Sequence, residues 1–253
     1  MRRPANFSFG RAVHDPGPEF PAVVLGRRTL YLRRSVAHLS PMVFAELREF
    51  ENSSHAGVGY RENGFVLKMN NGQDLFVRHA RRGGLVRFFS RDLYLGLHPR
   101  PVTELALTVE AQQRGIAVAE PLGAMIEWIA PFVYRGFFLT RAIAGMTLWD
   151  FLRTDDDPYV RNHVVEMTRE ALDAMHQRGL LHADLNLHNL LIAKLHESFT
   201  PVILDLDKAR LFATAVPVRM RRQNFARLRR SARKLDPGQR YVDDHTLERL
   251  TRL

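Results

Sequence analysis

Short apolar runs separated by turn residues characterise the first half of the chain. The runs Phe65-Val66-Leu67 and Leu75-Phe76-Val77 flank the turn Asn70-Asn71-Gly72, and this pattern predicts a β-hairpin. The apolar run Phe137-Phe138-Leu139-Thr140 predicts a further buried strand. We therefore expect the first half to be built around a sheet.

Helical periodicity dominates the second half and also occurs between the strands. The spacing of apolar residues predicts four helices. One begins at Ser40-Pro41, and the other three cover residues 102–114, 148–152 and 160–178. Gly115 and Gly179 follow the two longer helices, and glycine readily adopts the backbone conformation found after a helix end. A strand-rich first half and a helix-rich second half predict an α+β fold of two lobes with a crevice between them.

The expected domains follow from this organisation. Residues 39–141 would form a strand-rich N-lobe, and residues 142–253 would form a compact helical C-lobe. Residues 1–38 contain Gly10, Gly17 and several prolines, so we expect an irregular N-terminal segment there.

The composition narrows the classes of protein to consider. The 253 residues include no cysteine, which excludes disulfides and permits a reducing compartment. A formal net charge of +10 predicts an anionic partner, such as a nucleotide, a phosphorylated lipid or nucleic acid. The N-terminal residues lack the apolar stretch of a signal peptide. The most apolar stretch, Ala124 to Tyr134, contains Glu127 and Pro131 and is too short to cross a bilayer, so we expect neither an export signal nor a membrane span.

The functional prediction depends on two neighbouring stretches of the second half. Asp184 is followed five positions later by Asn189, and Asp205 comes after the apolar run Val202-Ile203-Leu204. This spacing matches the His-x-Asp-x-x-x-x-Asn and Asp-x-x arrangement of kinases. Phosphoryl transfer requires a carboxylate that orients the attacking hydroxyl and oxygen ligands that hold Mg²⁺ on the phosphates of ATP. We therefore expect Asp184 to be the catalytic base and Asn189 and Asp205 to be Mg²⁺ ligands.

The same polar residues could have a structural role or bind a different metal. Isolated Asp and Asn residues most often cap helices and turns, although three matched positions in order argue against a purely structural role. His182, Asp184 and His188 could instead form a metal site. His182 is more simply the packing histidine of a kinase loop, so we do not expect a metallo-hydrolase.

The first half carries the residues expected to bind ATP. Gly57 and Gly59 precede the hairpin, where a kinase brings its backbone close to the phosphates; a simple turn is the alternative. Glu104 lies on the next predicted helix, where a kinase places the acid that pairs with its phosphate-binding cation. That cation would be Arg78, at the position of the kinase lysine, and Lys68 is the alternative.

These motifs resemble those of the lipopolysaccharide kinase family, in particular its 3-deoxy-D-manno-octulosonic acid (Kdo) kinases. The resemblance covers about residues 55–235 and rests on five segments: Arg78 to Gly84, Glu104 before Gly115 to Pro121, His182 to Asn189, Leu204 to Asp207, and Asn224 to Ser231. Two positions depart from the family pattern, because Ala80 stands where an aromatic residue is usual and Leu206 where phenylalanine is usual.

The resemblance implies a bilobal protein-kinase-like fold and ATP-dependent phosphorylation of a Kdo hydroxyl on a Kdo-lipid A acceptor. It implies ATP and Mg²⁺ as cofactors and a peripheral location at the cytoplasmic face of the inner membrane, with that anionic surface as a partner. No Ala-Pro-Glu segment follows Asp207, which also favours a small-molecule or lipid-linked sugar acceptor over a protein.

Two alternative functions remain to be separated. A kinase of another family, such as an aminoglycoside-type phosphotransferase or a protein kinase, would keep the same motifs and differ in its acceptor. A non-catalytic kinase fold that binds an anionic membrane would fit the net charge, but it would have no need to keep Asp184, Asn189 and Asp205. Nucleic-acid binding is not expected, because cations interleave with aromatic residues only around Phe88-Phe89.

Two basic segments could bind acidic groups. Arg81 and Arg82 beside Gly83-Gly84 could engage carboxylates or phosphates of the acceptor, or they could form a solvated surface. Residues 218–234 hold eight cations and no acid. The same segment has apolar residues at helical spacing, namely Phe225, Leu228 and Ala232. Such a helix would bind an anionic membrane through its basic face, pack its apolar stripe on the C-lobe, or do both.

Overall fold

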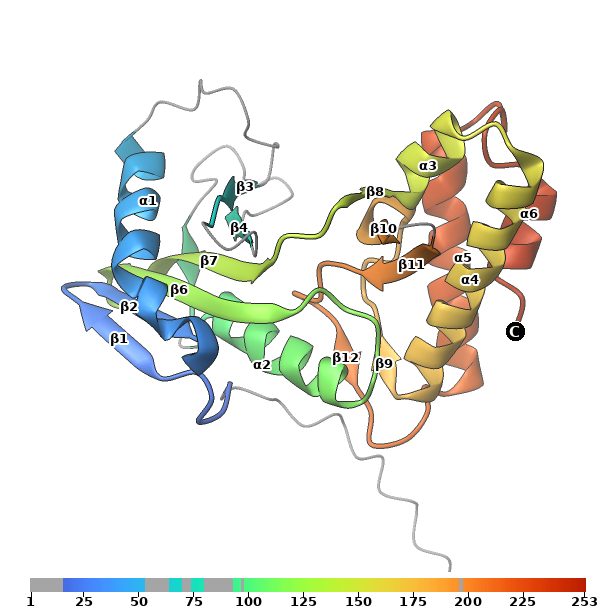
Figure 1. Ribbon diagram of the computed structural model, residues 1–253. Helices are drawn as coiled ribbons and strands as arrows, with labels where there is room; N and C mark the ends of the chain where they lie inside the picture. Colours follow the sequence, from blue (N-terminus) through green and yellow to red (C-terminus); the bar gives the residue numbers. More distant parts are fainter. Residues whose placement is uncertain (1–15, 53–63, 70–73, 80–92, 97, 196–197) are drawn as a thin grey trace, which may run out of the picture. The chain divides into compact units, whose positions relative to one another are not determined.

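The computed structural model describes residues 16–52, 64–69, 74–79, 93–96, 98–195 and 198–253 (Figure 1). The chain divides into two compact units, which are described separately. The first unit contains the described residues of 16–109 and 119–142, and the second contains residues 110–118 and 143–253.

The first unit is built on an antiparallel sheet in the order β1-β2-β6-β7-β4-β3, with β5 paired to β7. Its strands are β1 (Ala22–Leu25), β2 (Arg28–Leu32), β3 (Gly64–Leu67), β4 (Leu75–His79), β5 (Tyr94–Leu95), β6 (Pro121–Ala130) and β7 (Val133–Arg141). Its helices are η1 (Arg34–Leu39), α1 (Ser40–Asn52) and most of α2 (Arg100–Gln113).

The sheet of the first unit is apolar on both faces. Met125 and Phe137 belong to a core that includes side chains of α1, whereas their neighbours Ile126 and Phe138 belong to a second core with side chains of α2. Successive side chains of a strand point to opposite faces, so β6 and β7 need apolar residues at consecutive positions. Figure 1 shows α1 and α2 on opposite sides of these strands. The buried strand predicted over residues 137–140 is therefore confirmed.

The β3–β4 hairpin is the one predicted from the sequence, with Phe65 opposite Val77. In contrast, the expectation of an irregular segment over residues 1–38 is wrong for residues 22–32. Strands β1 and β2 form another hairpin there, and β2 pairs with β6. Leu30 and Leu32, two positions apart, are buried in the core of the sheet. The apolar run Ala22-Val23-Val24-Leu25 before Gly26 was a further signal, and the nearby prolines, glycines and arginines obscured both.

The second unit is mainly helical. Its helices are α3 (Leu148–Thr154), α4 (Pro158–Gln177), η3 (Leu187–Asn189), α5 (Val218–Leu235) and α6 (Asp244–Leu250). One small sheet contains β8 (Gly145–Thr147), β10 (Leu190–Leu195) and β11 (Ser198–Ile203), and a strand pair contains β9 (Leu180–Leu181) and β12 (Arg210–Leu211). Helix α4 packs against α6 and β11.

Residues 110–118, which we expected in the N-lobe, belong to the second unit. Arg114 follows α2, and its Nη1 donates to the carbonyl oxygens of Phe212 at 2.5 Å and Arg178 at 3.1 Å. The carbonyl oxygen of Ala117 accepts a hydrogen bond from the backbone N–H of Ile203 at 2.8 Å. These hydrogen bonds hold the end of α2 and the following residues within the second unit.

The predicted ends of the two longer helices are confirmed. Gly115 after α2 and Gly179 after α4 have φ angles of 72° and 86°, which is the left-handed region that favours glycine. At Gly179 a Cβ atom would also lie 2.5 Å from the carbonyl oxygen of Phe212. Backbone conformation and close packing therefore both require glycine at Gly179.

Helix α5 buries the apolar stripe that the sequence predicted. Phe225, Leu228 and Ala232 are at most 2% exposed, and the ring of Phe225 lies 5.0 Å from that of His176 in α4. The prediction that this stripe packs on the C-lobe is confirmed, so the stripe itself is not exposed to a membrane. No helix in the described part of the chain has the length and apolar composition needed to span a bilayer.

Candidate active site

The loop after β9 is held by His182, which is 1% exposed. Its Nδ1 accepts a hydrogen bond from the backbone N–H of Asp184 at 3.1 Å, and its Nε2 lies 2.8 Å from the carbonyl oxygen of Leu204. Since Nδ1 accepts, Nε2 carries the hydrogen and donates it to Leu204. Burial lowers the pKa of His182, which keeps the ring neutral. His182 therefore connects two segments: the loop that carries Asp184, and Leu204, which precedes Asp205.

Two asparagines fix the turn between Asp184 and β10. Asn186 caps η3, because its Oδ1 accepts from the backbone N–H groups of His188 at 2.9 Å and Asn189 at 3.2 Å. The side-chain amides of Asn186 and Asn189 both donate to the carbonyl oxygen of Asp184, each at 2.9 Å. The backbone N–H of Leu204, which precedes Asp205, donates to the carbonyl oxygen of Asn189 at 2.9 Å. The structure thus joins Asp184 and Asn189 directly and ties both to the segment that carries Asp205.

Asp205 has an unusual backbone conformation for a residue with a side chain. Its φ angle is 58°, in the left-handed region that only glycine, asparagine and aspartate visit with any frequency. Such outliers gather at functional sites, where the surrounding structure maintains them. The next residue, Leu206, is 2% exposed and anchors the segment, while the side chain of Asp205 is exposed.

The alternative metal site of His182, Asp184 and His188 is not assembled. Both ring nitrogens of His182 are engaged with the backbone, and the ring of His188 packs edge-on against Trp149 with centroids 6.4 Å apart. Among the residues that the structure describes, no three His, Asp or Glu side chains form a cluster that could hold a metal. The donors at hand are the oxygens of Asn189 and Asp205, which suit Mg²⁺ bound jointly with phosphate groups.

The first unit contains the predicted pair of a cation and an acid. Arg78 on β4 and Glu104 on α2 form an ion pair, in which Nη2 lies 2.5 Å from Oε1 and 2.6 Å from Oε2. Glu104 is 3% exposed, so the contact orders a guanidinium that is itself 22% exposed. The alternative cation, Lys68, pairs with Asp74 at 3.2 Å and is largely in solvent. The geometry therefore favours Arg78 over Lys68 as the partner of Glu104.

Several residues singled out by the sequence lie outside the described residues. They include Gly57 and Gly59, expected to approach the phosphates, and Arg81 and Arg82 beside Gly83-Gly84, expected to engage the acceptor. The turn Asn70-Asn71-Gly72, Ala80 and Phe88-Phe89 lie outside them as well.

Asn224 on α5 is 5% exposed, and its role was not predicted from the sequence. Its Nδ2 donates to the carbonyl oxygen of His182 at 2.6 Å, and its Oδ1 accepts from Nε2 of His176 at 3.0 Å. Asn224 thus links α5 and α4 to the loop of Asp184. The available signal was a polar residue beside Phe225 and four positions before Leu228, on the stripe that the helix buries.

Arg227, one turn after Asn224, reaches Asp184. Its Nη1 lies 3.8 Å from Oδ1 of Asp184, and the two side chains are 51% and 67% exposed. The sequence alone had placed Arg227 only in a basic surface. The structure places its guanidinium beside the carboxylate that we expect to be the catalytic base.

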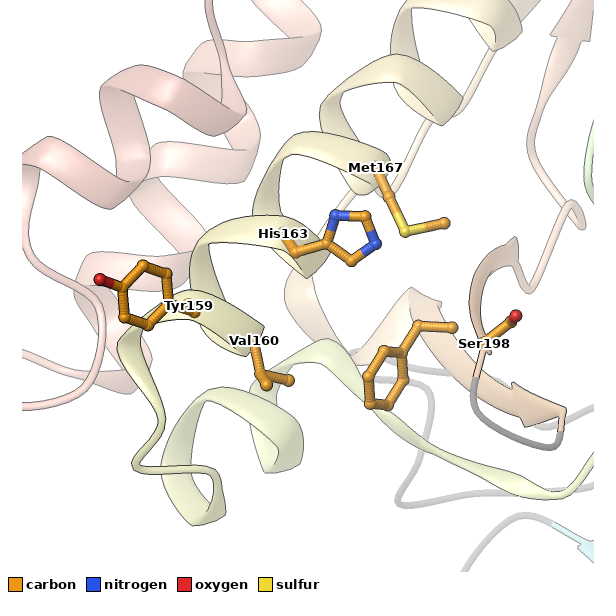
Figure 2. A pocket seen from close by; sticks show the side chains of 6 residues that line it. Tyr159, Val160, His163, Met167 and Ser198 are labelled. Atoms are coloured by element: carbon orange, nitrogen blue, oxygen red, sulfur yellow. The ribbon is translucent and has the colours of Figure 1, made fainter.

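A surface pocket of about 440 Å³ lies elsewhere in the second unit, and Figure 2 shows its lining. Val160, His163 and Met167 contribute from one face of α4, and Ser198 contributes from the start of β11. Strands rise about 3.3 Å per residue, so β11 separates Ser198 from the end that leads to Asp205. The pocket contains none of the predicted site residues.

A sequence model of the Lipopolysaccharide kinase (Kdo/WaaP) family matches residues 52–251. The chain belongs to this family. The match spans both structural units and confirms the resemblance seen in the motifs. It includes the Arg78–Glu104 pair and the loop of Asp184 and Asn189.

Individual relatives agree with this membership. A 3-deoxy-D-manno-octulosonic acid kinase from Xylella fastidiosa (strain M23) is 33% identical over 175 residues, which are 66% of this chain and 64% of that protein. The protein of the same name from Pasteurella multocida (strain Pm70) is 29% identical over 175 residues, 64% of this chain and 69% of its own. The matched part is thus slightly less than two thirds of the Xylella relative.

Solved structures confirm the expected α+β, protein-kinase-like fold. The structure described as WaaP in complex with acyl carrier protein has a TM-score of 0.55 at 20% identity and covers 88% of this chain and 87% of its own. The Rio2 kinase-ADP/Mg²⁺-phosphoaspartate complex from Chaetomium thermophilum has a TM-score of 0.50 at 12% identity, with 93% and 73% covered. At these identities the likeness concerns the fold alone.

Proposed function

We propose that this member of the lipopolysaccharide kinase family is an ATP-dependent kinase that phosphorylates a Kdo hydroxyl of a Kdo-lipid A acceptor. The observation that carries the proposal is the assembly of Asp184 and Asn189 by shared hydrogen bonds, with His182 joining them to the segment of Asp205. Relatives named as Kdo kinases, at about 30% identity, support the choice of acceptor.

In the proposed reaction Asp184 orients the acceptor hydroxyl and receives its proton. The acceptor oxygen forms a bond to the γ-phosphorus of ATP, and the bond from that phosphorus to the bridging oxygen of the leaving ADP breaks. Asp184 is exposed, and both of its backbone polar groups are fixed by hydrogen bonds. Its carboxylate is thus held on an ordered loop while remaining accessible to a substrate.

The oxygens of Asn189 and Asp205 would hold Mg²⁺ in this proposal. When bound, Mg²⁺ would neutralise the phosphate charge that develops during transfer. The amide nitrogen of Asn189 already donates to Asp184, so its Oδ1 is the atom that a cation would use. Asp205 contributes the negative charge of this pair, and its left-handed backbone is one that an aspartate tolerates.

Arg78 would bind the phosphates of ATP, with Glu104 as its positioning partner. Both oxygens of Glu104 lie within 2.6 Å of a single Arg78 nitrogen, Nη2. A guanidinium has five N–H donors in a planar fork, so one group can hold a carboxylate and phosphate oxygens together. A buried carboxylate that fixes this fork would therefore prepare it for the nucleotide.

Arg227 would recognise the acceptor. A Kdo sugar carries a carboxylate, and a cation beside the catalytic base is well placed to pair with an acidic group near the attacking hydroxyl. The guanidinium is half exposed, so it can exchange part of its contact with Asp184 for a substrate anion. Specificity for an acidic sugar would follow from this residue.

We also propose a peripheral location at the cytoplasmic face of the inner membrane, where a lipid-linked acceptor would be met. The cations of α5 support an anionic surface as partner, because Arg219, Arg222 and Arg230 are exposed. Each such cation near an anionic bilayer contributes on the order of 1 kcal/mol. Since the apolar stripe of α5 is buried, the attraction of this helix would be purely electrostatic.

Mass spectrometry of Kdo-lipid A incubated with the protein, ATP and MgCl₂ tests the proposed reaction. The expected product carries one additional phosphoryl group on Kdo, and Asp184→Ala should abolish it without loss of the fold. Failure of Kdo-lipid A to react, together with phosphorylation of an aminoglycoside or a peptide, would favour a kinase of another class. No transfer to any acceptor, with vesicle binding retained, would favour the non-catalytic alternative.

A further inference from the structure

Two turns and the end of β5 meet at one end of the sheet of the first unit. Arg27 in the β1–β2 turn contacts β6 through two hydrogen bonds. Its carbonyl oxygen accepts from the backbone N–H of Trp128 at 3.0 Å, and the Nη1 of its guanidinium donates to the carbonyl oxygen of Ile129 at 3.4 Å. The β6–β7 turn reaches the end of β5, because the carbonyl oxygen of Phe132 accepts from the backbone N–H of Gly96 at 2.9 Å. This end of the sheet is thus a continuous surface of turns.

Large apolar side chains are exposed at or near the ends of three strands and in the β6–β7 turn. We call the following four residues the apolar tip: Leu25 at 59% exposure, Leu95 at 67%, Ile129 at 36% and Phe132 at 56%. Single exposed apolar residues are common on soluble proteins, but adjoining ones indicate an interaction surface. Trp128 precedes Ile129 in the chain and packs on the core shared with α2, with its ring edge-on to that of Tyr134 at 5.6 Å.

The charged residues around the apolar tip are mainly cations. Arg28 and Arg135 pair with Glu127 at 3.2 Å and 3.8 Å, and Arg27 lies in the β1–β2 turn. Among the described residues 25–28, 94–96 and 127–135, the acid is therefore compensated and a net positive charge remains. Apolar side chains bordered by arginines are typical of surfaces that enter the boundary between lipid headgroups and acyl chains.

Phe132 holds an unfavourable backbone conformation within the tip. Its φ angle is 65°, which is a genuine outlier for a bulky side chain. A β-bulge on β6, between Trp128 and Ala130, precedes the same turn. Glycine would adopt this backbone conformation with less strain. An exposed phenylalanine at this position therefore indicates a functional role for its side chain.

We propose that the apolar tip inserts into an anionic lipid surface and orients the first unit against the membrane. The proposal rests on the peripheral location proposed above and assigns it to a specific surface. A lipid interface fits the observations better than a protein groove, because the residues lie at strand ends and in a turn and the charge beside them is net positive. A second copy of the chain pairing through the edge strand β1 is the alternative that the test must exclude.

The test measures partition of the purified protein onto vesicles of phosphatidylglycerol and phosphatidylethanolamine by co-sedimentation. Phe132→Gly removes the side chain and relieves the positive φ, so the fold is retained, and Leu95→Ser removes a second exposed group. Each change should weaken partition about tenfold, because each removes apolar surface that would leave water. In the wild type, vesicles with brominated acyl chains should quench Trp128, whereas Trp149 is buried in the second unit.

A matched control lies on the second unit, where Tyr159 at the start of α4 is also exposed. Tyr159→Ser should leave partition unchanged. If the wild-type protein does not bind vesicles, the proposed membrane location is wrong. If the Phe132→Gly and Leu95→Ser variants bind vesicles as well as the wild type does, the proposed role of the apolar tip is wrong. Loss of binding only in Arg222→Gln with Arg230→Gln would also overturn it, since α5 would then be the membrane contact.

Two further measurements separate the remaining outcomes. The rate of phosphotransfer to a soluble, deacylated Kdo acceptor should be the same in Phe132→Gly and the wild type. If neither protein transfers phosphate to this acceptor, the proposed kinase function is contradicted and the proposed role of the apolar tip is not. Sedimentation velocity should show no self-association that depends on Phe132; a dimer lost in Phe132→Gly, with unchanged vesicle binding, would identify the tip as a contact between copies.

Discussion

Arg227 on α5 places its guanidinium 3.8 Å from the carboxylate of Asp184, and both side chains are more than half exposed. An ion pair this exposed contributes only about 0–1 kcal/mol to stability, so folding gives little reason to keep it. Asn224, three residues earlier, fixes the helix to the loop of Asp184 through the carbonyl oxygen of His182. The two contacts together present a cation at the proposed position of the acceptor hydroxyl.

Arg227→Gln should therefore affect the acceptor and not the nucleotide. We expect the KM for a Kdo acceptor to rise about tenfold, the value of one lost charge-assisted contact, while the KM for ATP stays within twofold. The free energy of unfolding should change by less than about 1 kcal/mol. Arg230→Gln, an exposed change on the same helix, is the control. A parallel rise in both KM values would show that Arg227 contacts the phosphates of ATP instead.

The contacts of Asn224 and Arg227 could not be predicted from the sequence, whereas several elements of the fold could. The hairpin of β3 and β4, helices α2 and α4 and the spacing of Asp184 and Asn189 are local patterns, and periodicity was sufficient to predict them. Asn224 binds a carbonyl group 42 positions away, and no local pattern carries that information. The strands β1 and β2 were missed for another reason, since the apolar run Ala22-Val23-Val24-Leu25 and the alternating Leu30 and Leu32 stand among prolines, glycines and arginines that predict irregular structure.

Asp205→Asn should change the dependence on magnesium and leave the fold intact. Asparagine tolerates the left-handed backbone of this position, so the substitution removes a charge without adding strain. The Mg²⁺ concentration for half-maximal activity should rise at least about tenfold, because a hard cation loses an anionic oxygen ligand. Asp207→Asn is the matched variant two residues later. If Asp207→Asn shifts the titration and Asp205→Asn does not, the ligand assignment is wrong.

The ion pair of Arg78 and Glu104 should control nucleotide binding. Glu104→Gln keeps the shape of a side chain that is 3% exposed but removes the charge that orients Arg78. The KM for ATP should rise about tenfold or more, since the guanidinium loses its fixed position. Arg78→Lys should not restore activity, because an ammonium lacks the planar fork.

Lys68→Met is the control for this pair, because Lys68 contacts Asp74 and is 85% exposed. We expect its ATP kinetics to match those of the wild type. If Lys68→Met impairs ATP binding while Arg78→Lys does not, Lys68 is the phosphate-binding cation and the assignment of Arg78 fails.

Two buried histidines should make the protein sensitive to acid. Burial lowers the pKa values of His176 and His182 below the ordinary value of 6.5. Below pH 6.5 the unfolded chain binds protons that the folded chain does not, so the free energy of unfolding falls as the pH falls. The stabilisation is fully present above that pH and is lost as the pH falls through the folded-state values. Each histidine contributes a slope of up to about 1.4 kcal/mol per pH unit.

Urea unfolding at several pH values between about 7.5 and 5 measures this slope, and substitutions at one contact assign it. His176→Gln should reduce the slope by the contribution of one proton. Asn224→Asp places a carboxylate 3.0 Å from Nε2 of His176, which should raise the pKa of His176 and flatten the slope as well. The same change removes the donor to the carbonyl oxygen of His182, so kcat should fall while both KM values hold. A slope that survives His176→Gln and Asn224→Asp unaltered would show that His176 does not govern acid stability.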